Sequence, residues 1–275
     1  MKFLQFTIGI AALAALACAG GRADEATKKA PTSKIFLSES KGTGQIESNG
    51  KVFEPKQGTA FDAPGTVMMT NNDSHQAYVL SSGTGLYLDA NSQVKISQFD
   101  QEKFESTHLA ADVEPSVSHL NVLIMRGLIG LCASPMVSGT TVLFSTPLAS
   151  VNIRGRRVAI KVSAEETSVY ALEGSVTLRP GEKASGGVTL EPGEQAVVRP
   201  GGPGQEPQVA VGPIDNDLRS SLDGTVAVAC NARKTVAFEA VDNGAAAPEI
   251  VPKPTVSATP PNNLTVSPDR LNPGP

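Results

Sequence analysis

Apolar and polar residues alternate with a period of two through the middle of the chain, between turn-forming Gly, Pro, Asn and Asp residues. A period of two places successive side chains on opposite faces of a β-strand. The pattern predicts strands at Gln76–Leu80, Gly85–Asp89, Val94–Gln98, His119–Met125, Thr141–Ser145, Ala149–Arg154, Arg157–Ser163 and Ser168–Leu172. Many short strands separated by turns indicate an all-β fold, a two-layer β-sandwich or β-roll.

One sequence occurs twice within this region. VTLRPGEKA at Val176–Ala184 returns as VTLEPGEQA at Val188–Ala196. In both copies a Pro-Gly pair follows a strand pattern, where Pro fixes φ and Gly accepts the positive φ of a turn. We therefore predict two consecutive strand-turn units that stack or pair in register. Two copies are too few for a long solenoid.

Helix signals are weak. Gln98–Glu105 is compatible with a short turn of helix, and Ile214–Leu222 with a helix that Asp215 or Asn216 would cap. Ala229–Val241 is compatible with either a helix or a strand.

The N-terminus predicts a secretory signal peptide over residues 1–19. Lys2 gives a positive start, Phe3–Ala17 is almost unbroken in apolar residues, and small residues lead to a favoured cleavage site after Ala19. A lipid anchor at Cys18 is an alternative that the sequence favours less, because Ala15 rather than Leu stands three residues before it. No later segment reaches the length of a membrane helix, so we expect a secreted or periplasmic chain without a transmembrane span.

Composition divides the remaining chain into three parts. We predict a flexible lead-in over residues 20–50, a β domain over residues 51–200, and a low-complexity tail over residues 201–275, rich in Pro and Gly and holding the short helix. The end of this tail, from Pro248 onward, is expected to be disordered or extended. Such a segment would serve as a spacer.

Charge and composition exclude some classes of function. The chain carries 23 basic and 27 acidic residues, a net charge of −4, which does not favour nucleic acid as a partner. A local basic cluster of Arg154, Arg156, Arg157 and Lys161 would suit an anionic partner, although a solvated strand face is the simpler interpretation. With 4% aromatic residues and no Trp, the core must consist mainly of Val, Leu, Ile and Ala.

Two cysteines remain after the predicted cleavage. Cys132 and Cys230 allow a single disulfide in an oxidising compartment. Because Cys132 lies in the apolar stretch MRGLIGLCASPMV, a small buried thiol is its expected role.

No catalytic or metal-binding motif is evident. His75, His108 and His119 are scattered, without the spacing of a zinc site. The acidic groups Asp100, Glu102 and Glu105, and the pair Glu165 and Glu166, are better explained as solvated turns than as the paired carboxylates of a glycosidase. We therefore predict no enzyme activity, no catalytic residues, no metal and no cofactor.

The region from Ser145 to Val198 resembles the FecR domain. STPLASVNIRG, RVAIKV, TSVYALEGSVTL and GVTLEPGEQAVV follow that family's strand motifs, and SSGTGLYLDANSQVKISQF is similar to its upstream section, so the likeness spans about Gly58–Pro200. Matching motif positions, expected to be structural, are Thr146, Pro147, Arg154, Gly155, Glu173, Gly174, Gly193 and Glu194. The family usually has Thr after Arg-Gly, where this chain has Arg156 and Arg157.

The resemblance implies a binding module. Well-known FecR proteins are signal transducers with a cytoplasmic anti-sigma segment and a membrane helix, parts that we do not expect in this chain. We therefore favour a non-enzymatic extracytoplasmic binding or scaffold protein whose partner is an envelope protein or polymer. A regulatory component of FecR-type sigma-factor signalling is the first alternative, and an enzyme acting on envelope glycans is the second.

Overall fold

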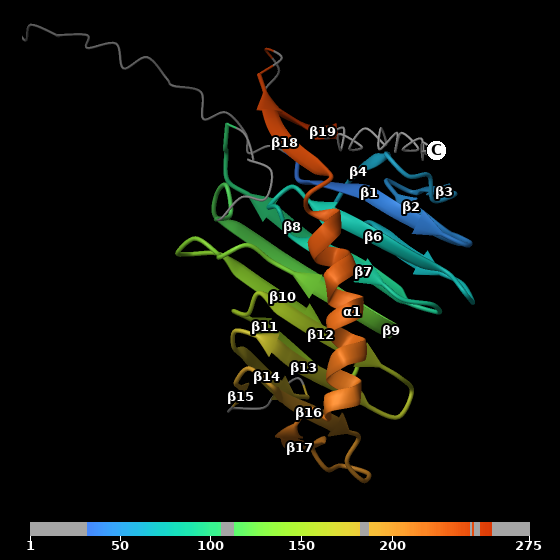
Figure 1. Ribbon diagram of the computed structural model, residues 1–275, viewed down its shortest axis with the longest axis vertical. Helices are drawn as coiled ribbons and strands as arrows, with labels where there is room; N and C mark the ends of the chain where they lie inside the picture. Colours follow the sequence, from blue (N-terminus) through green and yellow to red (C-terminus); the bar gives the residue numbers. More distant parts are fainter. Residues whose placement is uncertain (1–31, 106–112, 182–186, 243, 245–247, 255–275) are drawn as a thin grey trace, which may run out of the picture.

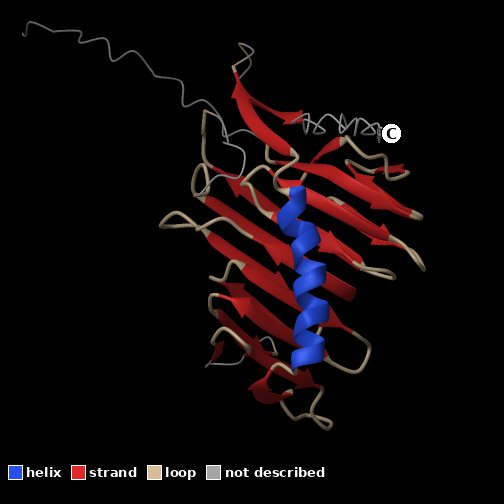
Figure 2. Cartoon of the chain, viewed as in Figure 1, coloured by secondary structure: helices blue, strands red, loops and turns tan. Residues whose placement is uncertain are grey.

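The chain folds as two packed β-sheets with a helix laid across the outside of one of them (Figure 1). This computed structural model describes residues 32–105, 113–181, 187–242, 244 and 248–254. Strands account for most of these residues, and α1 is the helix among them (Figure 2). The predicted all-β class and its layered sandwich architecture are confirmed.

The first sheet, sheet A, carries the helix on its outer face. Its strands lie in the order β4 (Ala60–Asp62), β1 (Lys34–Lys41), β6 (His75–Leu80), β7 (Gly85–Leu88), β9 (Ser118–Cys132), β12 (Arg157–Val162), β13 (Thr167–Glu173), β16 (Glu194–Arg199) and β17 (Gln208–Pro213). All of these pairings are antiparallel.

The second sheet, sheet B, packs against the inner face of sheet A. Its order is β3 (Lys51–Phe53), β2 (Gly44–Ser48), β5 (Val67–Thr70), β8 (Gln93–Gln101), β9, β10 (Thr141–Ser145), β11 (Ala149–Ile153), β14 (Val176–Pro180) and β15 (Val188–Leu190). The β9–β10 pairing is parallel and the other pairings in this sheet are antiparallel.

Strand β9 belongs to both sheets. Its first part, up to Arg126, pairs with β8 in sheet B, and its second part, from Gly127, pairs with β12 in sheet A. Gly127 has φ +105°, and a Cβ there would lie 2.1 Å from Oγ of Ser92. Only glycine fits this corner, where the strand leaves one layer and enters the other.

Two apolar clusters hold the layers together. The larger lies between the sheets and consists mainly of Val, Leu and Ile, with alternate residues such as Val158, Ile160 and Val162 facing inward. The second lies on the outer face of sheet A, where Ala77, Tyr87 and other sheet residues pack against α1 and the β18–β19 hairpin. Several strands of sheet A are therefore buried on both faces. The two-layer prediction did not include this third layer, formed by α1 and the β18–β19 hairpin.

Helix α1 (Asn216–Ala232) begins at the predicted place and is longer than predicted. The side chain of Asp215 caps it, since Oδ1 accepts hydrogen bonds from the backbone N–H groups of Asp217 (2.9 Å) and Leu218 (3.4 Å). The segment Ala229–Val241, for which helix and strand both remained open, contains the end of α1 and then β18 (Val236–Val241), which pairs with β19 (Glu249–Pro254).

The repeat forms paired units. The two VTL segments are β14 and β15, and they pair with each other antiparallel, Val176 opposite Leu190. The turn within the second copy closes with Glu194 N–H donating to the Glu191 carbonyl (3.0 Å), with Gly193 at φ +91°. The pairing of the two repeat units was predicted. The sequence did not predict that β14 and β15 lie in sheet B while β16, which follows the second turn, lies in sheet A.

Three expected boundaries differ from the structure. Residues 34–48, assigned to the flexible lead-in, form β1 and β2, whose apolar side chains such as Leu37 and Ile46 are fully buried. The region after 200, assigned to the tail, contributes β17, α1 and the β18–β19 hairpin. The expected helical turn Gln98–Glu105 is instead the end of β8 followed by a loop from residue 102. Phe99 is buried in the core, and the Gln101 side chain accepts a hydrogen bond from Ser81 Oγ (2.7 Å).

Some sequence predictions lie outside the described residues. They are the signal peptide with Cys18 and Ala19, His108, Ala184 and the final part of the tail from residue 255.

Candidate functional site

A groove of about 630 Å³ opens where three connections between strands meet. One wall is the loop from β9 to β10, and the other consists of the β11–β12 and β13–β14 turns. The residues that line it are Pro135, Met136, Val137, Ser138, Gly139, Thr140, Arg154, Arg156, Glu173 and Gly174. Strand alternation does not predict this meeting, because the pairing of the strands brings together three turns that are separate along the chain.

The two turns are joined through their backbones. Arg154 N–H donates to the Ser175 carbonyl (3.2 Å), and Arg156 N–H donates to the Glu173 carbonyl (2.8 Å). A Cβ on Gly155 would lie 2.8 Å from that same Glu173 oxygen. The turns approach this closely because glycine presents no side chain at their contact.

The buried carboxylate of Glu114 holds the far end of the loop wall. Its Oε2 accepts hydrogen bonds from the Thr140 hydroxyl (2.6 Å) and the Val137 N–H (3.4 Å), and its Oε1 accepts one from Ser118 Oγ. Burial raises the pKa of Glu114 above its ordinary value, although these hydrogen bonds act in the opposite direction. Sequence analysis did not identify this residue.

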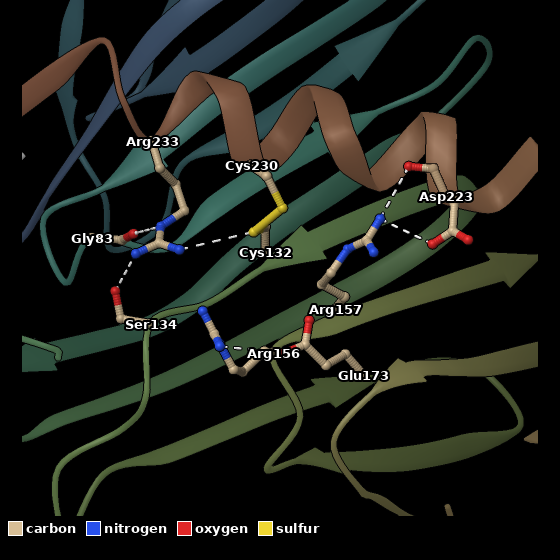
Figure 3. The surroundings of a disulfide bond; sticks show 9 residues. All are labelled: Gly83, Cys132, Ser134, Arg156, Arg157, Glu173, Asp223, Cys230 and Arg233. Atoms are coloured by element: carbon tan, nitrogen blue, oxygen red, sulfur yellow. Dashed lines mark hydrogen bonds and ion pairs between the residues drawn. A yellow bond between two sulfur atoms is a disulfide. The ribbon is translucent and has the colours of Figure 1, made fainter. Parts of the chain in front are cut away.

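The near end of the loop is held by α1 (Figure 3). Cys132, the last residue of β9, forms a disulfide with Cys230 of α1, so the expected free thiol at Cys132 is wrong. The cysteines lie 98 residues apart, and the helix brings them together when it packs on sheet A. Next along the loop, Ala133 N–H donates to the Arg156 carbonyl (2.8 Å).

Arg233 reinforces this end from the C-terminal cap of α1. Its guanidinium donates to the Gly83 carbonyl (2.5 Å) and to the Ser134 hydroxyl, as Figure 3 shows. Burial, and then the neighbouring charge of Arg156, lower the pKa of Arg233. Arg233 and Arg156 are therefore close enough for their charges to interact beside the groove.

The basic cluster seen in the sequence is divided by the fold. Arg154 and Arg156 line the groove, and Arg156 forms an ion pair with Glu173 at 3.3 Å. Arg157 points the other way, toward α1, where it pairs with Asp223 at 2.9 Å (Figure 3). Lys161 lies on an exposed position of β12. Among the described residues, the exposed guanidinium of Arg154 has no hydrogen-bond or ion-pair partner.

The remaining motif positions lie in other turns. Thr146 and Pro147 form the β10–β11 turn, where Thr146 Oγ1 accepts from the N–H groups of Leu148 (3.3 Å) and Ala149 (3.0 Å). Gly193 and Glu194 form the β15–β16 turn described above. Of the eight motif residues, Arg154, Glu173 and Gly174 line the groove, and Gly155 lies at the turn contact beside it.

The other titratable candidates do not converge. His75 contacts Glu39 at 3.0 Å, and His119 contacts the Thr141 hydroxyl at 2.9 Å. Glu166 pairs with Arg199 at 2.8 Å on the surface. Within the described ranges, no three His, Cys, Asp or Glu side chains gather as metal ligands would.

No helix in the described part of the chain is long and apolar enough to cross a membrane.

The sequence matches no protein-family model and no curated protein. Two crystal structures of a protein described as a putative anti-sigma factor from Parabacteroides distasonis align with the fold at a TM-score of 0.39 each, with 17% and 16% sequence identity. Each alignment covers 54% of this chain and 60% of that chain.

Proposed function

We propose that this chain is an exported, non-enzymatic binding protein built on a FecR-like β domain, and that the groove holds an envelope partner. The observation that carries the proposal is the convergence of the groove's walls. Its loop is fixed at one end by Glu114 and at the other by the Cys132–Cys230 disulfide and Arg233. A site held at both ends before the partner arrives loses little conformational freedom on binding.

Two features support export. The first is the tripartite N-terminal pattern, and the second is the disulfide, since disulfides persist chiefly in oxidising compartments. Mass spectrometry of the protein purified from its host should find a chain that begins at Gly20. A chain that retains residues 1–19 in the cytosolic fraction would contradict export, and a lipid on Cys18 would move the attachment point without moving the compartment.

The chemistry of the lining supports binding rather than catalysis. Its titratable groups are Arg154, Arg156 and Glu173, two cations and a carboxylate that pairs with one of them. General acid-base or nucleophilic catalysis instead needs a base within hydrogen-bond reach of a nucleophile or a reacting proton.

Site-directed crosslinking tests the proposal in the full-length protein. A photoreactive residue at Ser138, on the groove wall, should crosslink to an envelope component in the native host. The matched control is Thr189, an exposed position on β15 of sheet B. Crosslinking at Ser138 that equals crosslinking at Thr189, or that persists unchanged in the double variant R154Q/R156Q, would sink the idea.

A further inference from the structure

The charge of the groove differs in sign from that of the whole chain. The chain has a net charge of −4, whereas the lining carries Arg154 and Arg156 against the single carboxylate of Glu173. Arg233, whose guanidinium donates to Gly83 and Ser134, lies outside the lining itself. A local excess of positive charge attracts an anionic group.

The two arginines suit a carboxylate. A guanidinium presents its N–H donors as a planar fork that matches the two oxygens of a carboxylate. Glu173 already shows this preference, since its carboxylate lies 3.3 Å from a guanidinium nitrogen of Arg156. Arg154 is exposed and has no such partner among the described residues. Arg154 can therefore form with an incoming carboxylate the same kind of ion pair that Arg156 forms with Glu173.

The opposite wall has an apolar part, next to Ser138, Gly139 and Thr140. Pro135, Met136 and Val137 lie across the groove from the arginines, and Met136 also packs against the main core. Sugar hydroxyl groups pressed against Pro135, Met136 and Val137 would lose water without gaining partners from these side chains. An apolar side chain gains free energy at the same place. The wall therefore favours a peptide over a glycan.

We propose that the groove binds an acidic peptide segment of a partner protein. The Asp or Glu carboxylate of the segment lies against Arg154 and Arg156, and an adjacent apolar side chain packs on Met136 and Val137. This inference rests on the proposed function and deepens it by naming the partner class. Pockets of about 300–1,000 Å³ hold small ligands, so a few residues of the partner fill a groove of about 630 Å³.

The test is a selection with the full-length protein, purified after export. A phage library of random seven-residue peptides is selected on the wild type and counter-selected on R154E/R156E. The expected consensus holds Asp or Glu next to Leu, Ile, Val, Met or Phe. The selected peptide is then labelled with fluorescein, and its affinity is measured by anisotropy for each variant.

The variants should move the affinity in both directions. R154Q removes the unpaired guanidinium and should weaken binding about tenfold, the size expected for one charge-assisted hydrogen bond. E173Q removes the carboxylate that competes for Arg156 and should strengthen binding several-fold. R179Q changes an exposed arginine on β14, outside the groove, and should leave the affinity unchanged. Replacing the acidic residue of the peptide by its amide should abolish the effect of R154Q.

Three outcomes would overturn the inference. They are selection of no peptide, a consensus without an acidic residue, and equal affinities for R154Q and the wild type. Trigalacturonate serves as the glycan probe in the same assay. If it binds in an Arg154-dependent manner and no peptide does, the partner class proposed here is wrong while the groove remains a binding site. Loss of the specific crosslink at Ser138 would instead remove the proposed function itself.

Discussion

Gly155 and Gly174 touch across the two turns of the groove, so that a Cβ on Gly174 would lie 2.6 Å from Cα of Gly155. Gly174 also has φ +80°, a conformation that side chains disfavour. G174A should lower the free energy of unfolding by about 2–4 kcal/mol, because left-handed strain and overpacking add. Urea denaturation measures the change.

Gly65 provides the matched control for this substitution. Its φ is +79°, and a Cβ there would meet nothing within 4 Å. G65A should therefore show the strain alone, about 1–2 kcal/mol. Equal losses for G65A and G174A would mean that the contact between the two turns does not constrain residue 174.

The Cys132–Cys230 disulfide should contribute strongly to stability. It closes a loop with a sequence separation of 98, and a loop near that length is expected to contribute about 3–5 kcal/mol by restricting the unfolded chain. The double variant C132A/C230A should lose this amount in urea denaturation. Reductant should lower the midpoint of the wild type and leave the double variant unchanged. If reductant leaves the urea midpoint of the wild type unchanged, the Cys132–Cys230 disulfide is contradicted.

Glu114 should make stability fall as pH rises. Because burial raises the folded-state pKa of Glu114 above its ordinary value of 4.5, the folded protein binds this proton more tightly than the unfolded chain does. Its contribution is fully present below the ordinary value and is lost as pH rises through the raised value. The unfolding free energy of wild type minus that of E114Q should therefore decrease across this window. Parallel pH profiles for the two proteins would refute the assignment.

Asp62 should show the opposite dependence. The hydrogen bond from Lys34 Nζ, 2.7 Å from Oδ1, holds the pKa of Asp62 below its ordinary value of 3.8. Its contribution is present above that ordinary value and is lost as pH falls through the lowered one. The unfolding free energy of wild type minus that of D62N should therefore shrink in acid. A difference that stays constant with pH would show that the ion pair does not hold this carboxylate.

Asp215 should stabilise α1 as its N-cap. D215A removes the acceptor for the N–H groups of Asp217 and Leu218 and should cost about 1 kcal/mol. D215N keeps a side-chain oxygen in the same place and should cost a few tenths of that amount. Thermal or urea unfolding distinguishes the two, and equal losses would assign the effect to charge rather than to capping.

The sequence by itself determined the local elements of this protein. The alternation of apolar residues, as at Val158, Ile160 and Val162, predicted the strands. Backbone geometry points alternate side chains to opposite faces of a strand, and the face that is buried needs apolar residues. The Pro-Gly turn at Gly193 and the helix start at Asp215 were legible for the same reason, since turns and caps are formed by neighbouring residues.

Only the tertiary structure decided how these elements meet. The passage of β9 between sheets, the Cys132–Cys230 bond and the groove join residues far apart in sequence. Apolar burial favours many pairings of similar strands almost equally, so local pattern does not specify the neighbours of each strand. For this reason Glu114 and Arg233 gave no functional signal in the sequence, and only the folded chain brings them to the two ends of one loop.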